Sequence, residues 1–596
     1  MGKPRAGAAV RLEPRSAEDS VGWDDGIVPD ETPDVYGAFP RLTERQLRVL
    51  EHEGTRRTTA VGDVLFHQGD RDGDFYVVLA GTVATTEEGD VGEQVIGVHG
   101  PRRFLGELGL LNGEASFLSA VVRQPGVVLV VPVDRLRALV GRDSDLGDVI
   151  LRAYLVRRSI LIELGTGFRI VGSRFSRGTW RLREFATRNR LPHRFVDLEE
   201  DRSAELLLRQ LCVRPEETPV VIWHTRVLRN PSNTELARVV GLSGATGSVS
   251  MVDLLVVGAG PAGLAASVYG ASEGLCTVTL DATSAGGQAS LSPCIENYLG
   301  FPTGISGSEL AERAVVQATK FGALLSVPAA VTSLEEVDGA FSVAVAEGDS
   351  VAARAVLITT GARYRRPEVP RLREFEATSV YYAATQVEAQ VCRGDPVAVL
   401  GGGNSAGQAA LFLARHAESV RLLVRHGDLG RDMSRYLVDQ LERHPGVEIH
   451  LHTELRGLEG EGGVLRAVVV EDDRTHQRRT CDARALFIFI GAAPHTGWLA
   501  GDLALDDDGF VLTGSLLNSP AQRAAVGVGA PPLAHRPPLL LETSQPGVFA
   551  AGDVRSGSVK RVAAASGEGA MAVRMLHQYL ELSRSICASG STSSLM

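Results

Sequence analysis

Cysteine is scarce and scattered in this chain of 596 residues. Secreted folds held by disulfides and structural zinc sites both depend on closely spaced cysteines. No two cysteines here form a CxxC pair or a group with the spacing of zinc ligands. The sequence therefore argues against both classes and predicts no metal site. The six positions are Cys212, Cys276, Cys294, Cys392, Cys481 and Cys587.

Lysine, basic clusters and long apolar runs are also missing. All but three of the 61 basic residues are arginine, they are dispersed along the chain, and the formal net charge is −11. The first 20 residues lack the apolar core of a secretory signal, and no apolar run approaches the roughly 18 residues that span a membrane. We therefore expect a cytoplasmic protein that binds neither nucleic acid nor membrane.

Glycine is abundant instead, with 66 residues in short clusters between apolar runs. Clusters of this kind suit turns that hold nucleotides. At about 100–200 residues per domain, the length predicts about three to five domains.

The first glycine motif follows the apolar run Leu254 to Val257 and leads into a predicted helix. Its glycines permit a tight turn, and the N-terminus of the helix supplies N–H groups for a pyrophosphate. The next predicted strand ends in Asp281, whose carboxylate can bind a ribose hydroxyl. This context favours a dinucleotide site over a turn without a ligand. The motif contributes Gly258, Gly260, Pro261, Ala262 and Gly263.

A second motif of the same kind follows the predicted strand Val397 to Leu400, and it contributes Gly401, Gly403, Asn404 and Ser405. Its second strand ends in basic residues in place of an acid, namely Arg425 and His426, with Arg431 downstream. Cations at this point can pair with a 2′-phosphate, which favours NADPH over NADH. The alternative is that they are ordinary surface residues of an arginine-rich chain.

With these motifs, residues 251–582 resemble the thioredoxin reductase branch of the FAD- and NAD(P)-dependent disulfide oxidoreductases. The resemblance implies a homodimer in which an NAD(P) domain, residues 366–487, is inserted between two parts of an FAD domain, residues 252–365 and 488–583. It also implies further FAD contacts. These are Gly286, Gly287, Gln288, Asn297, Thr360, Gly361, Gly552, Asp553, Lys560, Arg561 and Val562.

The dithiol of that family has no counterpart here. In the segment Tyr382 to Gln386, Ala383 and Gln386 stand where the two cysteines of a CxxC would be. Thiol–disulfide exchange needs a nucleophilic sulfur and a resolving partner. Transfer of hydride from NADPH to FAD needs no protein acid or base, so no catalytic side chain is predicted.

Residues 35–164 resemble cyclic-nucleotide-binding domains, a β-roll followed by an exit helix. The segment Phe104 to Leu111 is similar to that family's phosphate-binding cassette, so Gly106 and Glu107 are candidate effector residues. The arginine that pairs with the phosphate in that family is absent, and the stretch begins with Glu114. A cyclic nucleotide, a different ligand, a degenerate regulatory fold and a docking platform all remain open.

Residues 165–243 resemble a thioredoxin or glutaredoxin fold, with Ser176 and Thr179 in the cysteine positions and a cis-proline turn at Thr218 to Val220. A pair of hydroxyls cannot cycle through a disulfide, which indicates a structural or docking module. With a disordered tail at residues 1–34, the predicted fold class is multidomain: a β-roll, an α/β thioredoxin-like module and two doubly wound α/β domains.

The leading hypothesis is a flavoprotein that passes electrons from NADPH through FAD directly to an acceptor, such as a ferredoxin, a flavodoxin, a quinone or a small molecule. One alternative is a non-catalytic redox sensor that binds FAD and NAD(P)H. Another is a residual thioredoxin-disulfide reductase that works through Cys294 or an external thiol.

Overall fold

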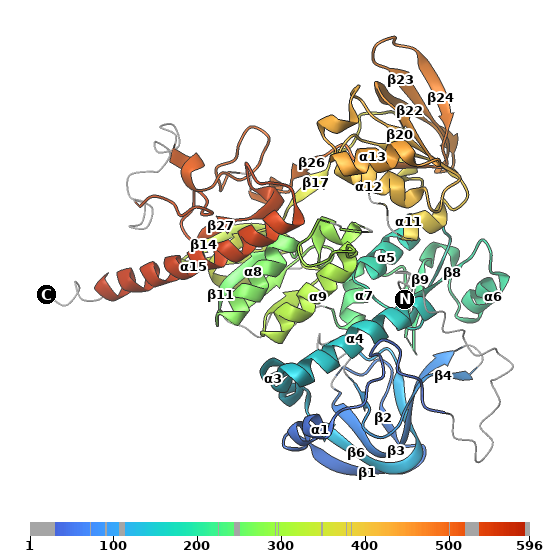
Figure 1. The fold of residues 1–596 in the computed structure, drawn as a ribbon, viewed down its shortest axis with the longest axis vertical. Coiled ribbons are helices and arrows are strands. Elements are labelled where there is room, and N and C mark those ends of the chain that lie inside the picture. Colours follow the sequence, from blue (N-terminus) through green and yellow to red (C-terminus); the bar gives the residue numbers. More distant parts are fainter. Residues whose placement is uncertain are drawn as a thin grey trace, which may run out of the picture. The chain divides into compact units, whose positions relative to one another are not determined.

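A computed structural model describes most of the chain. It covers residues 30–71, 73–89, 92–106, 114–224, 226–242, 251–292, 294–295, 297–346, 350–376, 378–382, 384, 386–499, 501–518 and 536–590. Residues 1–29 of the predicted tail lie outside this part, as do residues 243–250. The chain divides into two compact units (Figure 1). The first holds most residues up to Arg169, and the second holds most residues from Ile170 onward.

The first unit is an antiparallel β-roll closed by helices. The sheet has the order β1-β6-β3-β4, with β2 on β6 and β5 on β3. Its strands are β1 (Thr55–Thr59), β2 (Val64–Phe66), β3 (Phe75–Gly89), β4 (Gly92–His99), β5 (Phe104–Leu105) and β6 (Ser119–Val131). The helices are α1 (Glu44–Glu51), α3 (Val133–Arg142) and α4 (Ser144–Leu164).

Helix α4 is the exit helix expected at the end of this domain. The Asp143 carboxylate caps its first turn by accepting a hydrogen bond of 3.0 Å from the Leu146 N–H. At the other end Gly165 adopts the left-handed conformation, which ends the helix.

A small α/β module follows α4. Its sheet has the order β10-β9-β7-β8. The strands are β7 (Phe168–Gly172), β8 (His193–Asp197), β9 (Val220–Trp223) and β10 (Arg226–Arg229), and the helices are α5 (Arg177–Arg188), α6 (Arg202–Gln210) and α7 (Asn233–Val240). The peptide bond between Thr218 and Pro219 is cis.

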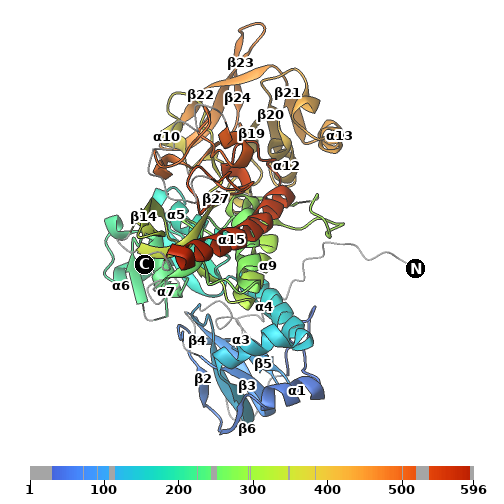
Figure 2. The same cartoon turned by 90° about the vertical axis from the view of Figure 1, so that its left-hand side faces the viewer.

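The largest sheet lies in the second unit and has the order β13-β12-β11-β16-β15-β14, with β27 on β16. Strands β11, β12, β13, β16 and β27 pair in parallel. Apolar side chains of α8 and α15 pack together against one face of this sheet. Figure 2 shows α15 as the long red helix. The elements are β11 (Val252–Val257), α8 (Pro261–Ser272), β12 (Thr277–Leu280), α9 (Gly307–Lys320), β13 (Leu324–Ser326), β14 (Val331–Val337), β15 (Ala340–Val345), β16 (Ser350–Ile358), β27 (Val548–Ala550) and α15 (Val562–Gly590).

A second parallel sheet, β18-β25-β19-β20-β21, is formed by residues between β16 and β27. The chain passes between the two sheets through β17 (Ala362–Tyr364) and β26 (Ala492–Pro494), which pair with each other. The other strands are β18 (Val380–Tyr381), β19 (Pro396–Leu400), β20 (Ser419–Leu423), β21 (Val447–His450), β22 (Thr453–Glu461), β23 (Val464–Asp472), β24 (Arg478–Asp482) and β25 (Ala485–Ile488). The helices are α10 (Leu372–Phe375), α11 (Gln386–Val391), α12 (Asn404–Leu413) and α13 (Arg435–Arg443).

Helix α15 extends to Gly590, seven residues beyond the predicted end of the last domain at residue 583. Among the described residues, no helix is both long enough and apolar enough to cross a membrane.

Candidate functional site

The second unit contains a cavity of about 570 Å³ at the first glycine motif, which we call the glycine-turn cavity. A volume of this size suits a cofactor or small ligand. Most of the residues predicted from the sequence to bind FAD line this cavity. They are Gly258, Gly260, Pro261, Ala262, Asp281, Gly287, Gln288, Thr360, Gly361, Gly552, Asp553, Lys560, Arg561 and Val562.

The first glycine turn is built for close approach of backbones. Gly258 has φ +108°, and a Cβ there would lie 2.4 Å from the carbonyl oxygen of Thr359. A Cβ at Gly263 would lie 1.9 Å from the carbonyl oxygen of Gly258, so α8 can begin directly against the turn only with glycine there. Gly260 caps α8, whose first N–H groups have no partner inside the helix. This cradle fits the pyrophosphate of a dinucleotide.

Asp281 holds the loops around that turn. Its Oδ2 accepts a hydrogen bond of 2.8 Å from the Ala259 N–H, and its Oδ1 accepts bonds from the N–H groups of Thr283 and Ser284 at 2.8 and 3.0 Å. A carboxylate oxygen can accept two hydrogen bonds, so Oδ2 keeps one position for a ribose hydroxyl. The Asp281 carboxylate therefore also stabilises the loops beside the glycine turn, a role that the sequence did not reveal.

Three predicted FAD contacts do not line the cavity. Gly263 acts through the close packing of the turn, and the Gly286 N–H donates to the Ala259 carbonyl at 2.7 Å. The Asn297 side chain is exposed and lies outside the cavity lining, so its FAD contact stays a prediction. Ile295 forms an isolated bridge with Ile305, and the residues that follow form a surface turn in which Leu299 is 94% exposed.

The residues after β27 form the far wall of the cavity. The N–H of Gly552 donates to the Glu568 carboxylate at 2.7 Å, which fixes this wall to α15. Burial raises the pKa of Asp553, and the nearby Lys560 charge opposes that shift. The Lys560 ammonium lies 4.5 Å from the centre of the Phe510 ring. Arg561 and Val562 stand at the start of α15, so its N-terminus faces the cavity as predicted.

The second glycine turn lies at the start of α12. A Cβ at Gly401 would lie 2.3 Å from the Phe489 carbonyl oxygen, and Gly403 caps the helix. Asn404 Oδ1 accepts a hydrogen bond of 2.7 Å from the Ser434 N–H, which ties this turn to the start of α13. Ser405 lines the glycine-turn cavity together with Gln408 and Ala409 of the same helix.

The basic residues predicted for the 2′-phosphate gather beyond β20. Arg431 Nη1 lies 3.2 Å from His426 Nδ1, and Arg425 and Arg431 are exposed. Asp432 lies nearby, 4.0 Å from His426 Nε2 and 3.9 Å from Arg431 Nε. The group carries a net positive charge, but a phosphate bound there would lie near the Asp432 carboxylate.

Comparison with known proteins agrees with this arrangement. The model of the pyridine nucleotide-disulphide oxidoreductase family matches residues 252–523. A thioredoxin reductase of Treponema pallidum is 32% identical over 329 residues, which cover 55% of this chain and 97% of that protein. The chain belongs to the thioredoxin reductase family. It is also similar to a thioredoxin reductase of Streptomyces clavuligerus, with 30% identity over 55% of this chain and 94% of that protein.

A plant member of the thioredoxin reductase family is similar over a smaller share of its own length. NADPH-dependent thioredoxin reductase 3 of Arabidopsis thaliana is 30% identical over 344 residues, 57% of this chain and 60% of that protein. In addition, the model of the cyclic nucleotide-binding domain matches residues 56–143. The chain therefore combines a thioredoxin reductase-like flavoprotein oxidoreductase domain with a cyclic nucleotide-binding domain in the β-roll.

The segment of the reductase domain that lacks the dithiol borders the glycine-turn cavity. Ala384 lines the cavity and is 3% exposed, whereas Ala383 lies outside the described residues. No cysteine belongs to the lining where the structure describes it. Cys392 is buried, which raises the pKa of its thiol to about 12. Cys294 is half-buried and is not one of the lining residues.

Several residues that line the cavity were not predicted. Tyr364 is half-buried overall, and burial of its hydroxyl raises the pKa of that group to about 12. Tyr364 and Gln408 lie three residues after the predicted contacts Gly361 and Ser405, which were a signal for them. No sequence pattern marks the others, which are Arg188, before the reductase domain, and Phe489, His495 and Trp498, after the inserted domain.

The candidate effector site in the β-roll is only partly described. Gly106 lines a cavity of about 40 Å³ with Phe117 and residues of α4, whereas Glu107 lies outside the described residues. His99 also lines it and is 1% exposed. Burial and the nearby charges of Arg157 and of a second arginine lower the pKa of His99 well below its ordinary value. The cavity has room for a water molecule or so.

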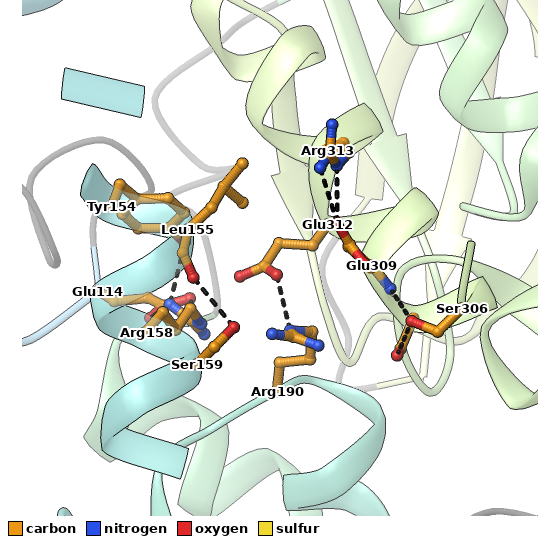
Figure 3. Close-up of polar contacts among 11 residues, drawn as sticks. Glu114, Tyr154, Leu155, Arg158, Ser159, Arg190, Ser306, Glu309, Glu312 and Arg313 are labelled. Atoms are coloured by element: carbon orange, nitrogen blue, oxygen red, sulfur yellow. Dashed lines mark hydrogen bonds and ion pairs between the residues drawn. The ribbon is translucent and has the colours of Figure 1, made fainter. Parts of the chain in front are cut away.

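Glu114 has a partner that the sequence did not suggest. Arg158 of α4 donates from Nη1 to Glu114 Oε2 at 2.6 Å and from Nη2 to Oε1 at 3.1 Å (Figure 3). Its Nη1 also donates to the Tyr154 hydroxyl at 3.0 Å. The two charged side chains are only 4% and 3% exposed. The acid found in place of the family's arginine therefore forms a buried ion pair with the exit helix.

Proposed function

We propose that this protein is an FAD-containing NADPH oxidoreductase that delivers electrons from the flavin to an acceptor without a dithiol of its own. The observation that carries the proposal is the segment that borders the glycine-turn cavity at Ala384. This is where thioredoxin reductases carry their CxxC, and its two cysteine positions are taken by Ala383 and Gln386. A disulfide relay cannot form there.

The FAD assignment is supported by the fit of the first glycine turn. The close contacts at Gly258 and Gly263 leave space at the start of α8 for a pyrophosphate but not for a side chain. Asp281 keeps one acceptor position for a ribose hydroxyl. A bound flavin supplies the ability to accept a hydride from a nicotinamide and to pass the electrons on. The protein's part is to hold the cofactor and to admit the nucleotide.

NADPH is favoured over NADH by the cluster of Arg425, His426 and Arg431 after β20. In a dinucleotide fold the end of this strand lies beside the adenosine ribose, where NADPH carries its 2′-phosphate. Charge-assisted hydrogen bonds from guanidinium and imidazolium groups would stabilise that phosphate. NADH offers them only a neutral hydroxyl.

The α/β module is proposed to be a thioredoxin-like domain without a redox centre. Ser176 caps α5, and Thr179 is fully buried near the cis-Pro219. A Cβ at Gly172 would lie 2.4 Å from Thr179 Oγ1 and 2.9 Å from Pro219 Cβ, so the corner is closely packed. Hydroxyl groups in the two cysteine positions favour a structural or docking role.

For the β-roll we propose a regulatory or docking role in preference to ordinary cyclic-nucleotide sensing. The arginine that pairs with the phosphate in the cyclic-nucleotide-binding family is absent from this sequence. Glu114, in the corresponding stretch, is held in a buried ion pair with Arg158. Calorimetry with cyclic AMP and cyclic GMP tests this, and micromolar or tighter binding would contradict it.

The main experiment uses purified holoprotein without oxygen. NADPH should bleach the flavin absorption faster than NADH, and addition of a quinone, a ferredoxin or a flavodoxin should restore the colour. Oxidised thioredoxin should not restore it. Absence of bleaching with both nucleotides would refute the enzyme proposal and leave a redox sensor.

A Cys294→Ser variant tests the remaining thiol route, with Cys392→Ser as the matched control at a buried thiol. We expect both variants to keep the wild-type rate with every acceptor. A selective loss of thioredoxin reduction in Cys294→Ser would show that the protein is a residual disulfide reductase.

A further inference from the structure

The wall of the glycine-turn cavity contains one residue from outside the reductase domain. Arg188 is the last residue of α5, which belongs to the α/β module, and it lines the cavity together with Gly260 and Ser284. The family match begins only at residue 252. A module with no dinucleotide motif of its own therefore supplies a guanidinium group to the cavity.

The two residues after Arg188 fix it in place. Asn189 Nδ2 donates to the carbonyl oxygen of Thr283, which itself lines the cavity, at 3.1 Å. Arg190 Nε pairs with Glu312 Oε2 of α9 at 2.7 Å, and the Glu312 side chain is only 7% exposed (Figure 3). Three consecutive residues thus contact the FAD-type half of the reductase domain, and the two flanking contacts are polar and directional.

The guanidinium of Arg188 is only partly satisfied. Its Nη2 pairs with Glu184, one helical turn earlier, at 2.5 Å. Its Nε is buried and has no hydrogen-bond acceptor in the described part of the chain. The charge also acts inside the cavity, because it lowers the pKa of the Tyr364 hydroxyl against the larger effect of burial.

We propose that Arg188 binds an anionic group of the dinucleotide in the glycine-turn cavity, so that the α/β module completes the cofactor site of the reductase domain in the same chain. This inference rests on the proposed FAD function. The anionic group has two sources on one cofactor: the pyrophosphate, which is always charged, and the flavin ring, which gains negative charge on reduction. Both would be recognised by the same guanidinium.

The test measures FAD binding to the full-length apoprotein by fluorescence quenching, and the midpoint potential of the holoprotein. Arg188→Met should raise the FAD dissociation constant by roughly 10- to 100-fold if the pyrophosphate is the partner, with an unchanged potential. If the reduced ring is the partner, oxidised FAD should bind as in the wild type and the potential should fall. For a two-electron couple, each tenfold loss in affinity for the reduced form lowers the potential by about 30 mV.

Arg209→Met is the matched control. Arg209 lies on α6 of the same module and pairs with Glu205 at the same spacing, 2.6 Å apart, but it does not line the cavity. We expect its FAD affinity and potential to stay at wild-type values. Arg188→Lys, which keeps the charge, should recover part of the lost affinity. Arg188→Gln replaces Arg188→Met if the methionine variant does not fold.

The outcomes distinguish a failure of the proposed FAD function from a failure of the role proposed for Arg188. If the wild-type apoprotein binds no FAD, the proposed function itself fails. If wild-type protein binds FAD, and a folded Arg188→Met or Arg188→Gln variant binds it within twofold with an unchanged potential, the role of Arg188 is overturned. An equal loss in Arg209→Met would also overturn it, because general damage to the module would then explain the effect.

Discussion

The buried ion pair between Glu114 and Arg158 allows a quantitative test of how the β-roll is held to its exit helix. The perturbation is removal of one charged partner at a time, in the variants Glu114→Leu and Arg158→Met. Each single variant leaves a charge whose side chain is at least 96% buried in the wild type. The double variant Glu114→Leu/Arg158→Met removes both charges and replaces them with apolar side chains.

The expected losses in stability follow from the burial and geometry of the ion pair. Loss of one partner from a buried ion pair costs about 3–5 kcal/mol, since the other charge is left without compensation. Replacement of both partners by apolar residues of similar size is often nearly neutral. Here the double variant also loses the hydrogen bond from Arg158 to the Tyr154 hydroxyl, worth about 1 kcal/mol. The double variant should therefore be more stable than either single variant and slightly less stable than the wild type.

Hydrogen exchange measured by mass spectrometry is the appropriate assay, because a chain with several domains has no single unfolding free energy. Peptides from β6 and α4 should exchange at least about 100-fold faster in each single variant, in line with a loss of about 3 kcal/mol or more. Glu53→Gln is the control: it breaks the Arg135–Glu53 pair, whose arginine is 65% exposed, and should cost at most about 0.5 kcal/mol. Single variants that exchange like this control, or a double variant worse than both singles, would refute the reasoning.

Three further predictions test the cofactor sites and the β-roll. Gly263→Ala should abolish FAD retention on purification because its Cβ would meet a carbonyl oxygen, whereas Gly567→Ala, at a helical glycine with open space, should retain the flavin. Arg431→Gln should raise the KM for NADPH about tenfold and leave that for NADH unchanged. Arg313→Gln, whose arginine pairs with Glu309 on α9 outside the inserted domain, is the unaffected control. Burial, together with two nearby arginines, lowers the pKa of His99, so the unfolded chain binds more protons below about pH 6.5. The protection factors of amides in the β-roll, which correct for the pH dependence of intrinsic exchange, should therefore fall as the pH falls. His99→Asn should remove this fall, and its persistence would assign the pH dependence to another group.

The dinucleotide turns were predictable because their chemistry is local. A tight turn between a buried strand and a helix requires glycine at fixed positions, and Gly258 and Gly401 both have positive φ in the structure. The acid at the end of the second strand was also found from its spacing. Its hydrogen bonds to three backbone N–H groups were not, because no sequence pattern distinguishes an aspartate that binds ribose from one that also organises loops.

The residues that escaped prediction depend on contacts between distant parts of the chain. Arg158 stands 44 residues after Glu114. Because the chain contains many arginines, the sequence does not indicate which of them pairs with Glu114. Arg188 is separated from the first glycine motif by about 70 residues, and its role follows only from the contact of α5 with the reductase domain. Asn297 is the opposite case: its motif is present in the sequence, but its side chain is exposed and outside the cavity lining, so its FAD contact stays a prediction.

The contacts of α5 also bear on why two dithiols are missing from one chain. The Trp180 ring of α5 lies 5.1 Å from the ring of Tyr381, which precedes Ala384 by three residues, and Arg177 donates to the Arg373 carbonyl at 2.6 Å. The helix that begins at Ser176 is therefore packed against the segment where the reductase family carries its CxxC. A shuttle that exchanges disulfides must leave its partner to reach the next one, whereas α5 is packed through a half-buried tryptophan and a polar contact. With the role proposed for Arg188, α5 would serve the cofactor site and would need no dithiol of its own.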